Sequence, residues 1–292
     1  MSAYLKNPSV WQESWDRQQE AFLPDREHRF AAMLDAVAAV GFSPSSSGGS
    51  SSGGSSSGGS SSGGSSSGGG SSADGSSASD GPRLLDLAGG TGSISLRTLA
   101  RFPGARVTVL DQDPVLLTIA ESSLRHFGER ATIVDADLGD PAWRTKLPHD
   151  GFDAVLTATA LHWLPAERVS ALYAEIREVL RPGGVFANAD HMPEEGLPSL
   201  SVQLRDHARA EREARYAAGA STSWPEWWAR AAADEQLAPK AVERERIYPA
   251  REHGDEWTPP ASWHVRALLD GGFQEAGVIW RGGTDAAVAA LR

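Results

Sequence analysis

Three acidic side chains near the ends of short apolar runs are the residues of this sequence best suited to holding a polar ligand. Asp86 lies within RLLDLAGGTG, Asp111 directly follows RVTVL, and Asp137 ends TIVDAD. A carboxylate at a strand end can hold a cation or a hydroxyl, and Asp111 can accept two hydrogen bonds from ribose hydroxyls. Each acid also has a simpler interpretation: Asp86 caps a helix, Asp111 belongs to an ordinary DQDP turn, and Asp137 faces solvent.

The glycine-rich turn after the first apolar run strengthens the ligand interpretation. Gly90 and Gly92 remove side chains where the backbone must bend and where a ligand can touch it. The segment SISLRTLARF follows at once as an amphipathic helix, whose first amides can bind an anion. A strand, a glycine turn, a helix and a second strand ending in an acid together predict a nucleotide-cofactor site.

The rest of the chain supplies the elements that must position this site. TIVDAD predicts a third strand and FDAVLT (152–157) a fourth, while 167–180 has the apolar spacing of a helix. A turn at Pro182-Gly183-Gly184 leads into a fifth strand. The tail predicts a helix at 263–269, then two strands, GVIW and AAVAAL, joined as a hairpin through 281–285.

Composition limits the classes of function. The 292 residues carry a formal net charge of −11, which does not suit a phosphate backbone. Cysteine is absent, so disulfides, thiolate nucleophiles and cysteine-based metal sites are excluded. No apolar run approaches the length of a membrane span, and the first residues lack a signal pattern. We therefore expect a cytoplasmic protein, a monomer or homodimer, with no nucleic-acid or membrane partner.

One segment cannot contribute to a folded core. Residues 43–81 are almost entirely serine and glycine, with SSSGG recurring every five residues, as in a flexible linker of natural or engineered origin. The linker divides a helical piece, 1–42, from the core, 82–191. We expect a helical substrate cap at 192–262, with helices at 200–218 and 224–235, and a final helix and hairpin at 263–292 that complete the sheet.

The spacing of AGGTG, of the acids after the second and third strands, and of EVLRPGGVF resembles class I S-adenosylmethionine-dependent methyltransferases that act on small molecules, similar to trans-aconitate methyltransferase-like enzymes. The likeness covers about residues 83–191 and part of the tail. Ala88 stands where the family motif has its first glycine, a mild departure. The resemblance implies an α/β, doubly wound, Rossmann-like sheet of seven strands in the order 3-2-1-4-5-7-6, with the last strand antiparallel.

The resemblance also implies where S-adenosylmethionine binds. Asp137 would accept a hydrogen bond from the adenine amino group, with Leu138 as an apolar wall for the ring. The ALHWL segment would line the cofactor, which makes His162 a structural or cofactor-shell residue. The full set of cofactor residues expected on this basis is Asp86, Ala88, Gly89, Gly90, Gly92, Asp111, Gln112, Asp137, Leu138, Thr157 and His162.

The family likeness places the acceptor pocket beneath an N-terminal lid and the helical cap. Aromatic faces there would attract a sulfonium cation, although the same aromatics could simply dock the helices on the core. His191, after the fifth strand, is the first candidate for a general base and His162 the second, whereas His253 and His264 are expected at the surface. His191 with Asp190, Glu194 or Glu195 could bind a metal, but the spacing is not diagnostic, and we predict none. The residues expected around the acceptor are Tyr4, Trp11, Trp15, His191, Trp224 and Trp228.

These features predict methyl transfer to a small molecule, at a carboxylate or hydroxyl oxygen, by in-line displacement. The position after the fourth strand is TATA (157–160) rather than the N-P-P-Y or D-P-P-Y of enzymes that methylate amide or base nitrogens. Nitrogen or carbon methylation of a small metabolite remains an alternative. A protein of this fold that binds the cofactor without transferring the methyl group is another.

Overall fold

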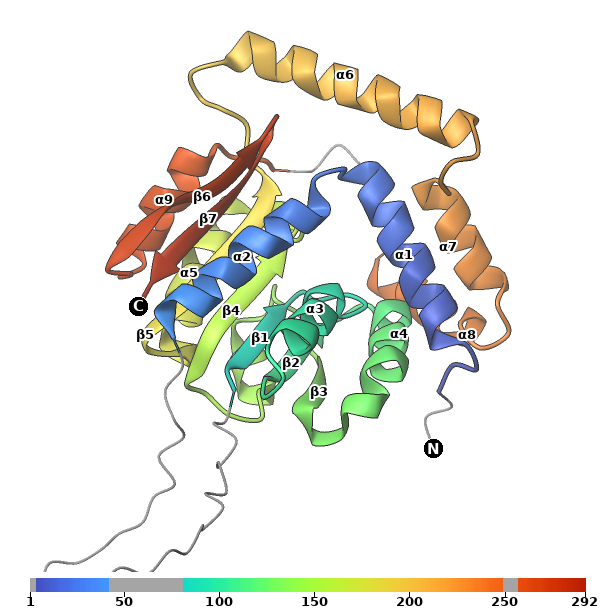
Figure 1. The fold of residues 1–292 in the computed structure, drawn as a ribbon, viewed down its shortest axis with the longest axis horizontal. Helices are drawn as coiled ribbons and strands as arrows, with labels where there is room; N and C mark the ends of the chain where they lie inside the picture. The colour runs from blue at the N-terminus through green and yellow to red at the C-terminus, as the bar shows by residue number, and fades with distance from the viewer. Residues whose placement is uncertain (1–3, 42–80, 249–256) are drawn as a thin grey trace, which may run out of the picture.

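A computed structural model describes residues 4–41, 81–248 and 257–292 of the chain. The predicted serine- and glycine-rich linker lies outside the described residues, apart from Gly81. Elements are named below by the labels of Figure 1.

A seven-stranded sheet in the order β3-β2-β1-β4-β5-β7-β6 runs through the middle of the molecule (Figure 1). β7 is antiparallel to both of its neighbours, and the other described pairs are parallel, which confirms the predicted fold class. The parallel strands β1 to β4 end at one edge, with Asp111 level with Asp135. The strands are β1 Arg83–Leu87, β2 Arg106–Asp111, β3 Ala131–Asp135, β4 Phe152–Ala158, β5 Leu180–His191, β6 Glu275–Gly282 and β7 Asp285–Leu291.

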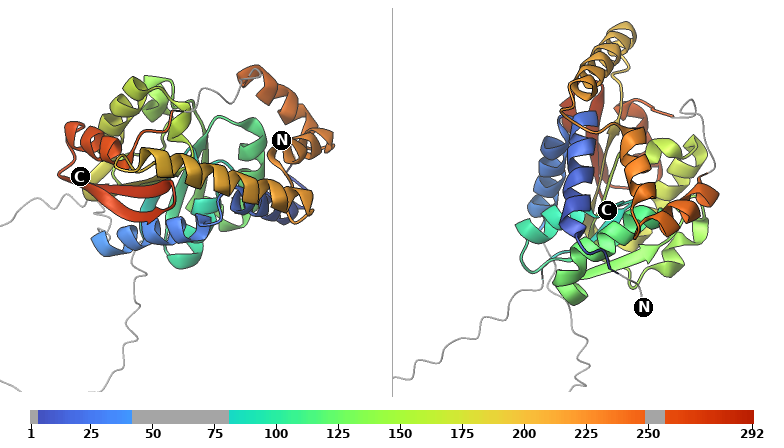
Figure 2. Two further views of the ribbon diagram at one scale, coloured as in Figure 1. Left: turned by 90° about the horizontal axis from the view of Figure 1, so that it is seen from above. Right: turned by 90° about the vertical axis from the view of Figure 1, so that its right-hand side faces the viewer.

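Helices cover both faces of the sheet, because β1 and its neighbours present apolar side chains in both directions. α2, α3 and α4 pack on one face, and α5 and α9 pack on the other (Figures 1 and 2). Phe30 and Met33 of α2 belong to the first of these cores, so α2 is a sheet-covering helix. The bounds are α2 Arg26–Val40, α3 Ser93–Arg101, α4 Pro114–Leu124, α5 Ala166–Val179 and α9 Ala261–Asp270.

The remaining helices stand at the end of the sheet where β1 to β3 finish. α1 lies between α4 and α7, and α6 spans the top of the molecule in Figure 1 with only Ser201 buried. A tryptophan cluster joins the N-terminal helix to the helical insertion: Trp11 and Trp15 pack edge-on against Trp227. The bounds are α1 Pro8–Phe22, α6 Pro198–Ala217, α7 Trp224–Ala233 and α8 Ala238–Ile247.

Short 3-10 turns connect several elements: η1 Arg125–Arg130, η2 Pro141–Lys146 and η3 Leu161–Trp163. β3 ends two residues earlier than the sequence pattern predicts, so Asp137 lies in the turn after it. Asp137 accepts a hydrogen bond from the backbone N–H of Gly139 at 2.7 Å, as an aspartate in a turn commonly does. None of the helices in the described residues combines the length and the apolar character that crossing a bilayer requires.

Candidate active site

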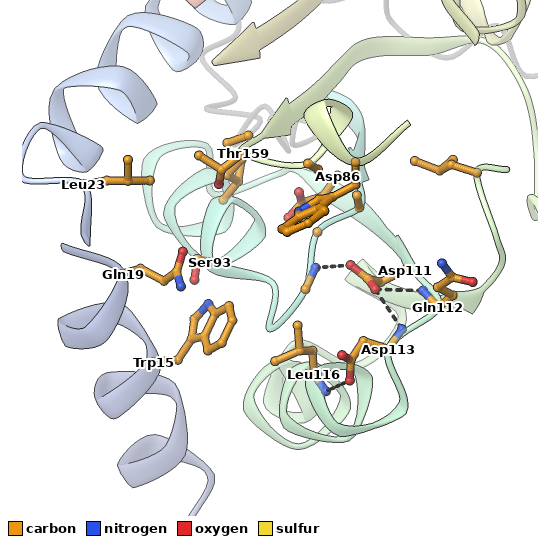
Figure 3. Close-up of a pocket in the computed structure, with 18 of the residues that line it drawn as sticks. Trp15, Gln19, Leu23, Asp86, Ser93, Asp111, Gln112, Asp113, Leu116 and Thr159 are labelled. Atoms are coloured by element: carbon orange, nitrogen blue, oxygen red, sulfur yellow. Dashed lines mark hydrogen bonds between the residues drawn. The ribbon is translucent and has the colours of Figure 1, made fainter. Parts of the chain in front are cut away.

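A cavity of about 440 Å³ opens at the carboxyl ends of β1 to β4, a volume within the range of small-molecule sites. The strand ends and the glycine turn form one wall, and helices α1, α2, α7 and α8 contribute the others. Figure 3 shows Trp15, Gln19 and Leu23 on the α1 side and Asp86, Asp111 and Thr159 across from them. Chain segments far apart in sequence therefore meet in one site.

The glycine turn after β1 forms the floor of the cavity through Ala88, Gly89 and Gly90. Gly89 must lack a side chain, because a Cβ there would lie 2.7 Å from Cγ of Asp86. Gly92 lies outside the cavity lining, at the N-cap of α3 with a φ of 77°. Ala88 has a φ of 54°, in the left-handed region that favours glycine, so replacing the family's glycine there leaves the backbone strained.

Thr159, just after β4, is the other non-glycine residue with positive φ in the described chain, at 51°. This conformation is unfavourable for a β-branched side chain. Both Thr159 and Ala88 line the cavity, on opposite sides of the junction between β1 and β4. Backbone strain of this kind concentrates where a fold holds a ligand-binding surface in place.

Asp111 is fixed at the cavity wall by main-chain donors. Its Oδ2 accepts from the N–H of Gly90 at 2.8 Å, and its Oδ1 accepts from Gln112 and Asp113 at 2.8 and 2.9 Å. Burial raises the pKa of Asp111 to about 6, despite these donors. Oδ1 already accepts two hydrogen bonds, whereas Oδ2 accepts one and keeps a further lone pair for a ligand. Gln112 lines the cavity beside it.

Asp86 reaches the cavity from within the sheet and is almost fully buried. Its Oδ2 accepts from the backbone N–H and the hydroxyl of Ser95, at 3.0 and 2.8 Å, so it also holds the first turn of α3. Its Oδ1 has no hydrogen-bond partner among the described residues. Burial raises the pKa of Asp86 to about 6. Asp86 therefore has both a structural contact and an unused acceptor.

Asp137 and Leu138, in the turn after β3, also line the cavity. Leu138 is buried, whereas Asp137 is exposed at the rim. The structure thus brings Asp86, Asp111 and Asp137 to a single cavity, although the sequence alone also allowed three unrelated roles.

Several residues at the roof had no recognisable signal in the sequence. Arg244 of α8 donates to Oδ2 of Asp113 at 2.6 Å, and its guanidinium lies 3.7 Å from the ring centroid of Trp228. Tyr248, at the end of α8, also lines the cavity. These contacts hold the helical insertion over Asp111 and Gln112. α8 has alternating charges and no motif, so only the tertiary structure identifies it.

α1 is attached to the glycine turn by a group of side-chain contacts that we call the latch: Gln12, Asp16, Thr91 and Ser93. The Gln12 amide donates to the hydroxyls of Thr91 and Ser93 at 3.0 and 3.1 Å. Asp16 accepts from Ser93 at 2.7 Å and from Arg26 at 2.8 Å. Burial opposes its ionisation, but Arg26 and Arg97 hold the pKa of Asp16 below its usual value. The latch therefore attaches α1 to the glycine turn.

The predicted aromatic residues divide between the cavity and the core. Trp15, Trp224 and Trp228 line the cavity. Trp11 is buried against Trp227 outside the lining, so it docks the helix. Tyr4 is exposed and lies under the guanidinium of Arg125, outside the lining as well.

The two histidines proposed as bases lie outside the cavity lining. His191 lies opposite Asp285 in the β5–β7 pair and bonds its Oδ1 through Nδ1 at 2.7 Å. His162 is buried, and its Nδ1 lies 2.7 Å from Asp190 Oδ1. Although burial opposes ionisation, these two histidines hold the pKa of Asp190 at about 2. Both imidazole rings therefore bond, through Nδ1, to carboxylates on strands of the sheet.

Two further sequence-based placements need correction, and one cannot be assessed. His264 is buried, where its Nδ1 lies 2.6 Å from the hydroxyl of Tyr173, and burial lowers its pKa to about 4. Thr157 is buried outside the cavity lining, because strand alternation directs it, like Val155, to the face covered by α5 and α9. His253 lies outside the described residues. No group of three metal-ligating side chains occurs among the residues that the structure describes.

Comparison with known proteins agrees with this geometry. Residues 84–184 match the methyltransferase domain family. The ubiquinone/menaquinone biosynthesis C-methyltransferase of Paracoccus denitrificans is 39% identical over 105 residues, 36% of this chain and 40% of that protein. The trans-aconitate 2-methyltransferase of Escherichia coli O1:K1 / APEC is 30% identical over 125 residues, 43% of this chain and 44% of that protein. The chain therefore spans less than half the length of the curated relatives it matches.

A solved structure extends the likeness to more of the chain. The S-adenosylmethionine-dependent methyltransferase SibL, in its apo form, superposes with a TM-score of 0.50 at 18% identity, over 73% of this chain and 50% of that one. At this identity the match concerns the fold. Residues 84–184 of this chain therefore match the methyltransferase domain family, and the sheet order, glycine turn and strand-end acids agree with the class I, S-adenosylmethionine-dependent type that the sequence resembles.

Proposed function

We propose that this protein transfers the methyl group of S-adenosylmethionine to an oxygen atom, a carboxylate or a hydroxyl, of a small molecule. The observation that carries the proposal is the convergence of Asp111, Asp137 and the glycine turn on one cavity. The net charge of −11 supports a small acceptor over a nucleic acid.

The residues at this end of the cavity fit the cofactor chemically. Asp111 would hold the ribose hydroxyls, Leu138 and Asp137 would hold the adenine, and the glycine turn would pass beneath the amino-acid part. Asp86 has a buried oxygen with no partner among the described residues, which suits an ammonium donor. The missing Cβ of Gly89 leaves the turn close to that carboxylate. When bound, the cofactor supplies an electrophilic methyl group on a positively charged sulfur.

The chain's own contribution is to enclose and orient the reactants. Trp15, Trp224 and Trp228 would exclude water from the cavity, and their ring faces favour a nearby cation. The latch would couple closure by α1 to the turn that carries the cofactor. We infer that alignment of acceptor and methyl group, rather than proton transfer, is the main catalytic effect.

The cavity lining supports an oxygen acceptor that is already ionised. Among the described residues, no histidine or lysine lines the cavity. The two carboxylates with a pKa near 6, Asp86 and Asp111, lie at the cofactor end. A carboxylate acceptor carries its own negative charge and needs no base, so this lining suffices for it.

The test combines calorimetry with mass spectrometry. The protein should bind S-adenosylhomocysteine, and incubation with S-adenosylmethionine and a metabolite extract should give a product heavier by one methylene whose methyl group is on oxygen. Binding without any product would favour a cofactor-binding protein. A methyl group found on carbon or nitrogen would overturn the oxygen assignment.

A further inference from the structure

Arg29 is a buried charge with unused hydrogen-bond donors. Its side chain on α2 is 2% exposed, and Nη2 pairs with Oδ2 of Asp285. Its Nε and Nη1 have no acceptor among the described residues. A guanidinium carries five N–H donors, and leaving charged donors unpaired in a buried place is costly. A ligand with a hydrogen-bond acceptor would satisfy the two free donor groups of Arg29.

The surroundings of Arg29 leave its charge incompletely balanced. Asp285 also accepts from His191, so one carboxylate serves two bases. Burial lowers the pKa of His191, but the hydrogen bond and charge of Asp285 raise it above its usual value overall. The centroid of the Trp280 ring lies 5.2 Å from the guanidinium carbon of Arg29. A tryptophan ring carries no negative charge, so it does not replace a carboxylate as a partner for the free N–H groups. The Nε and Nη1 donors of the guanidinium therefore still lack an anionic partner among the described residues.

Arg29 borders the part of the cavity opposite the strand-end acids. The cavity has four carboxylates, those of Asp86, Asp111, Asp113 and Asp137, and all belong to β1, β2 or the turns that follow β2 and β3. Around Arg29 the lining contains the apolar side chains of Leu23 and Phe30, and Leu164 and the segment 158–160 after β4 also line the cavity. Arg26, the other arginine of α2 in the lining, is paired with Asp16. Arg29 is thus an arginine of the lining that has free donors and lies beside apolar side chains.

We propose that Arg29 receives a carboxylate of an acceptor molecule whose remaining body is apolar. This inference rests on the proposed function, because it assigns the end of the cavity that the cofactor leaves open. Asp285 acts as a positioning residue because it holds Nη2 of the guanidinium, and His191 in turn holds the other oxygen of Asp285. Leu23, Phe30 and Leu164 contact the apolar body. A competing occupant of Arg29 is the carboxylate of the cofactor itself.

The experiment uses pairs of probes that differ only in charge: phenylacetate and hexanoate, with phenylacetamide and hexanamide. Binding to the full chain saturated with S-adenosylhomocysteine is followed by tryptophan emission, since Trp15, Trp224 and Trp228 line the cavity. We expect each acid to bind at least about tenfold more tightly than its amide, the cost of leaving a charged group unpaired. The Arg29→Met variant should lose this preference and still bind S-adenosylhomocysteine.

Control variants distinguish the proposed role of Arg29 from the proposed methyltransferase function on which it rests. Arg230→Met, which removes a guanidinium stacked on Trp11 outside the cavity, should keep the preference for acids. If Arg29→Met does not fold, Arg29→Lys and the wild-type comparison of acid with amide remain decisive. Equal binding of acid and amide, or no acid binding at millimolar concentration, overturns the inference while cofactor binding leaves the proposed function standing. Failure of S-adenosylhomocysteine to bind overturns the proposed function itself.

One outcome identifies the competing occupant. If Arg29→Met weakens S-adenosylhomocysteine by about tenfold or more but leaves methylthioadenosine unaffected, Arg29 holds the cofactor's carboxylate. Methylthioadenosine lacks the amino-acid part, so it reports on the nucleoside site alone. That result would overturn the acceptor assignment.

Discussion

The two ends of the cavity are built in different ways. The acids and the glycine turn at the β1 to β3 end come from one stretch of chain, and Asp111 is fixed there by backbone amides. The end at α2 gathers side chains from α1, α2 and the segment after β4, which are far apart in sequence. The first end can thus be recognised from a motif, whereas the second exists only when the helices are docked.

The largest effect is expected at the motif end. Asp111→Ala should weaken S-adenosylhomocysteine binding by about 1–3 kcal/mol, because ligand hydroxyls and three backbone donors lose a charged acceptor. Calorimetry measures this directly. Asp135→Ala is the matched control, since Asp135 pairs in register with Asp111 but is exposed and outside the cavity lining. Unchanged affinity in Asp111→Ala would remove this carboxylate from the site.

The latch tests whether the two ends depend on each other. Asp16→Ala should lower the free energy of unfolding by about 1–2 kcal/mol, because it leaves the buried guanidinium of Arg26 without its carboxylate. Asp16 is partly exposed, and solvent screening therefore keeps the expected loss this small. Denaturant unfolding measures the loss, and hydrogen exchange should show faster opening of α1. Glu13→Ala, on an exposed position of the same helix, should do neither. An α1 that stays protected in Asp16→Ala would show that tryptophan packing alone holds it.

The raised pKa values predict how the motif end responds to pH. The pKa values of Asp86 and Asp111 are about 6 in the folded protein, above their unfolded values. Protonation of these two groups therefore favours the folded state. The resulting stabilisation is complete below the unfolded pKa and is lost as the pH rises through about 6. Cofactor affinity should behave oppositely, because the ionised carboxylates are the better acceptors. Between about pH 5 and pH 6 it should rise by at most roughly tenfold for each proton released.

Calorimetry in two buffers of different ionisation enthalpy counts the protons released on binding. Proton release that persists unchanged in Asp111→Asn would assign the titration to another group.

The smallest effect concerns the strained turn. Ala88→Gly should stabilise the protein by about 1 kcal/mol, because glycine adopts a φ of 54° without the steric cost that alanine has there. Denaturant unfolding is the measurement. Ala142→Gly, at an exposed helical position, should instead destabilise by about 0.5–1 kcal/mol. Equal destabilisation by both substitutions would show that the turn is not strained.

The sequence was sufficient to predict the fold and to predict that the three strand-end acids and the glycine turn meet in one cavity. Alternation of strands and helices predicts a parallel α/β sheet, and the resemblance to the methyltransferase family implies the strand order that the structure has. Acids at the ends of parallel strands meet at one edge of such a sheet. The sequence did not predict Arg29 or Arg244, because a single arginine on a helix has no signature until its tertiary partners are known. Helix periodicity likewise did not reveal the buried contact between His264 and Tyr173, which lie on different helices.

The pairing of β5 with β7 places Asp285 directly across from His191, at the first residue of the last strand. That carboxylate is absent from the cavity lining, yet it forms an ion pair with an arginine that belongs to the lining. The C-terminal hairpin therefore does more than complete the sheet. A chain that lost β7 would carry an arginine without its counter-ion in the cavity lining, so if Arg29 binds the acceptor as proposed, the protein's choice of ligand would change together with its stability.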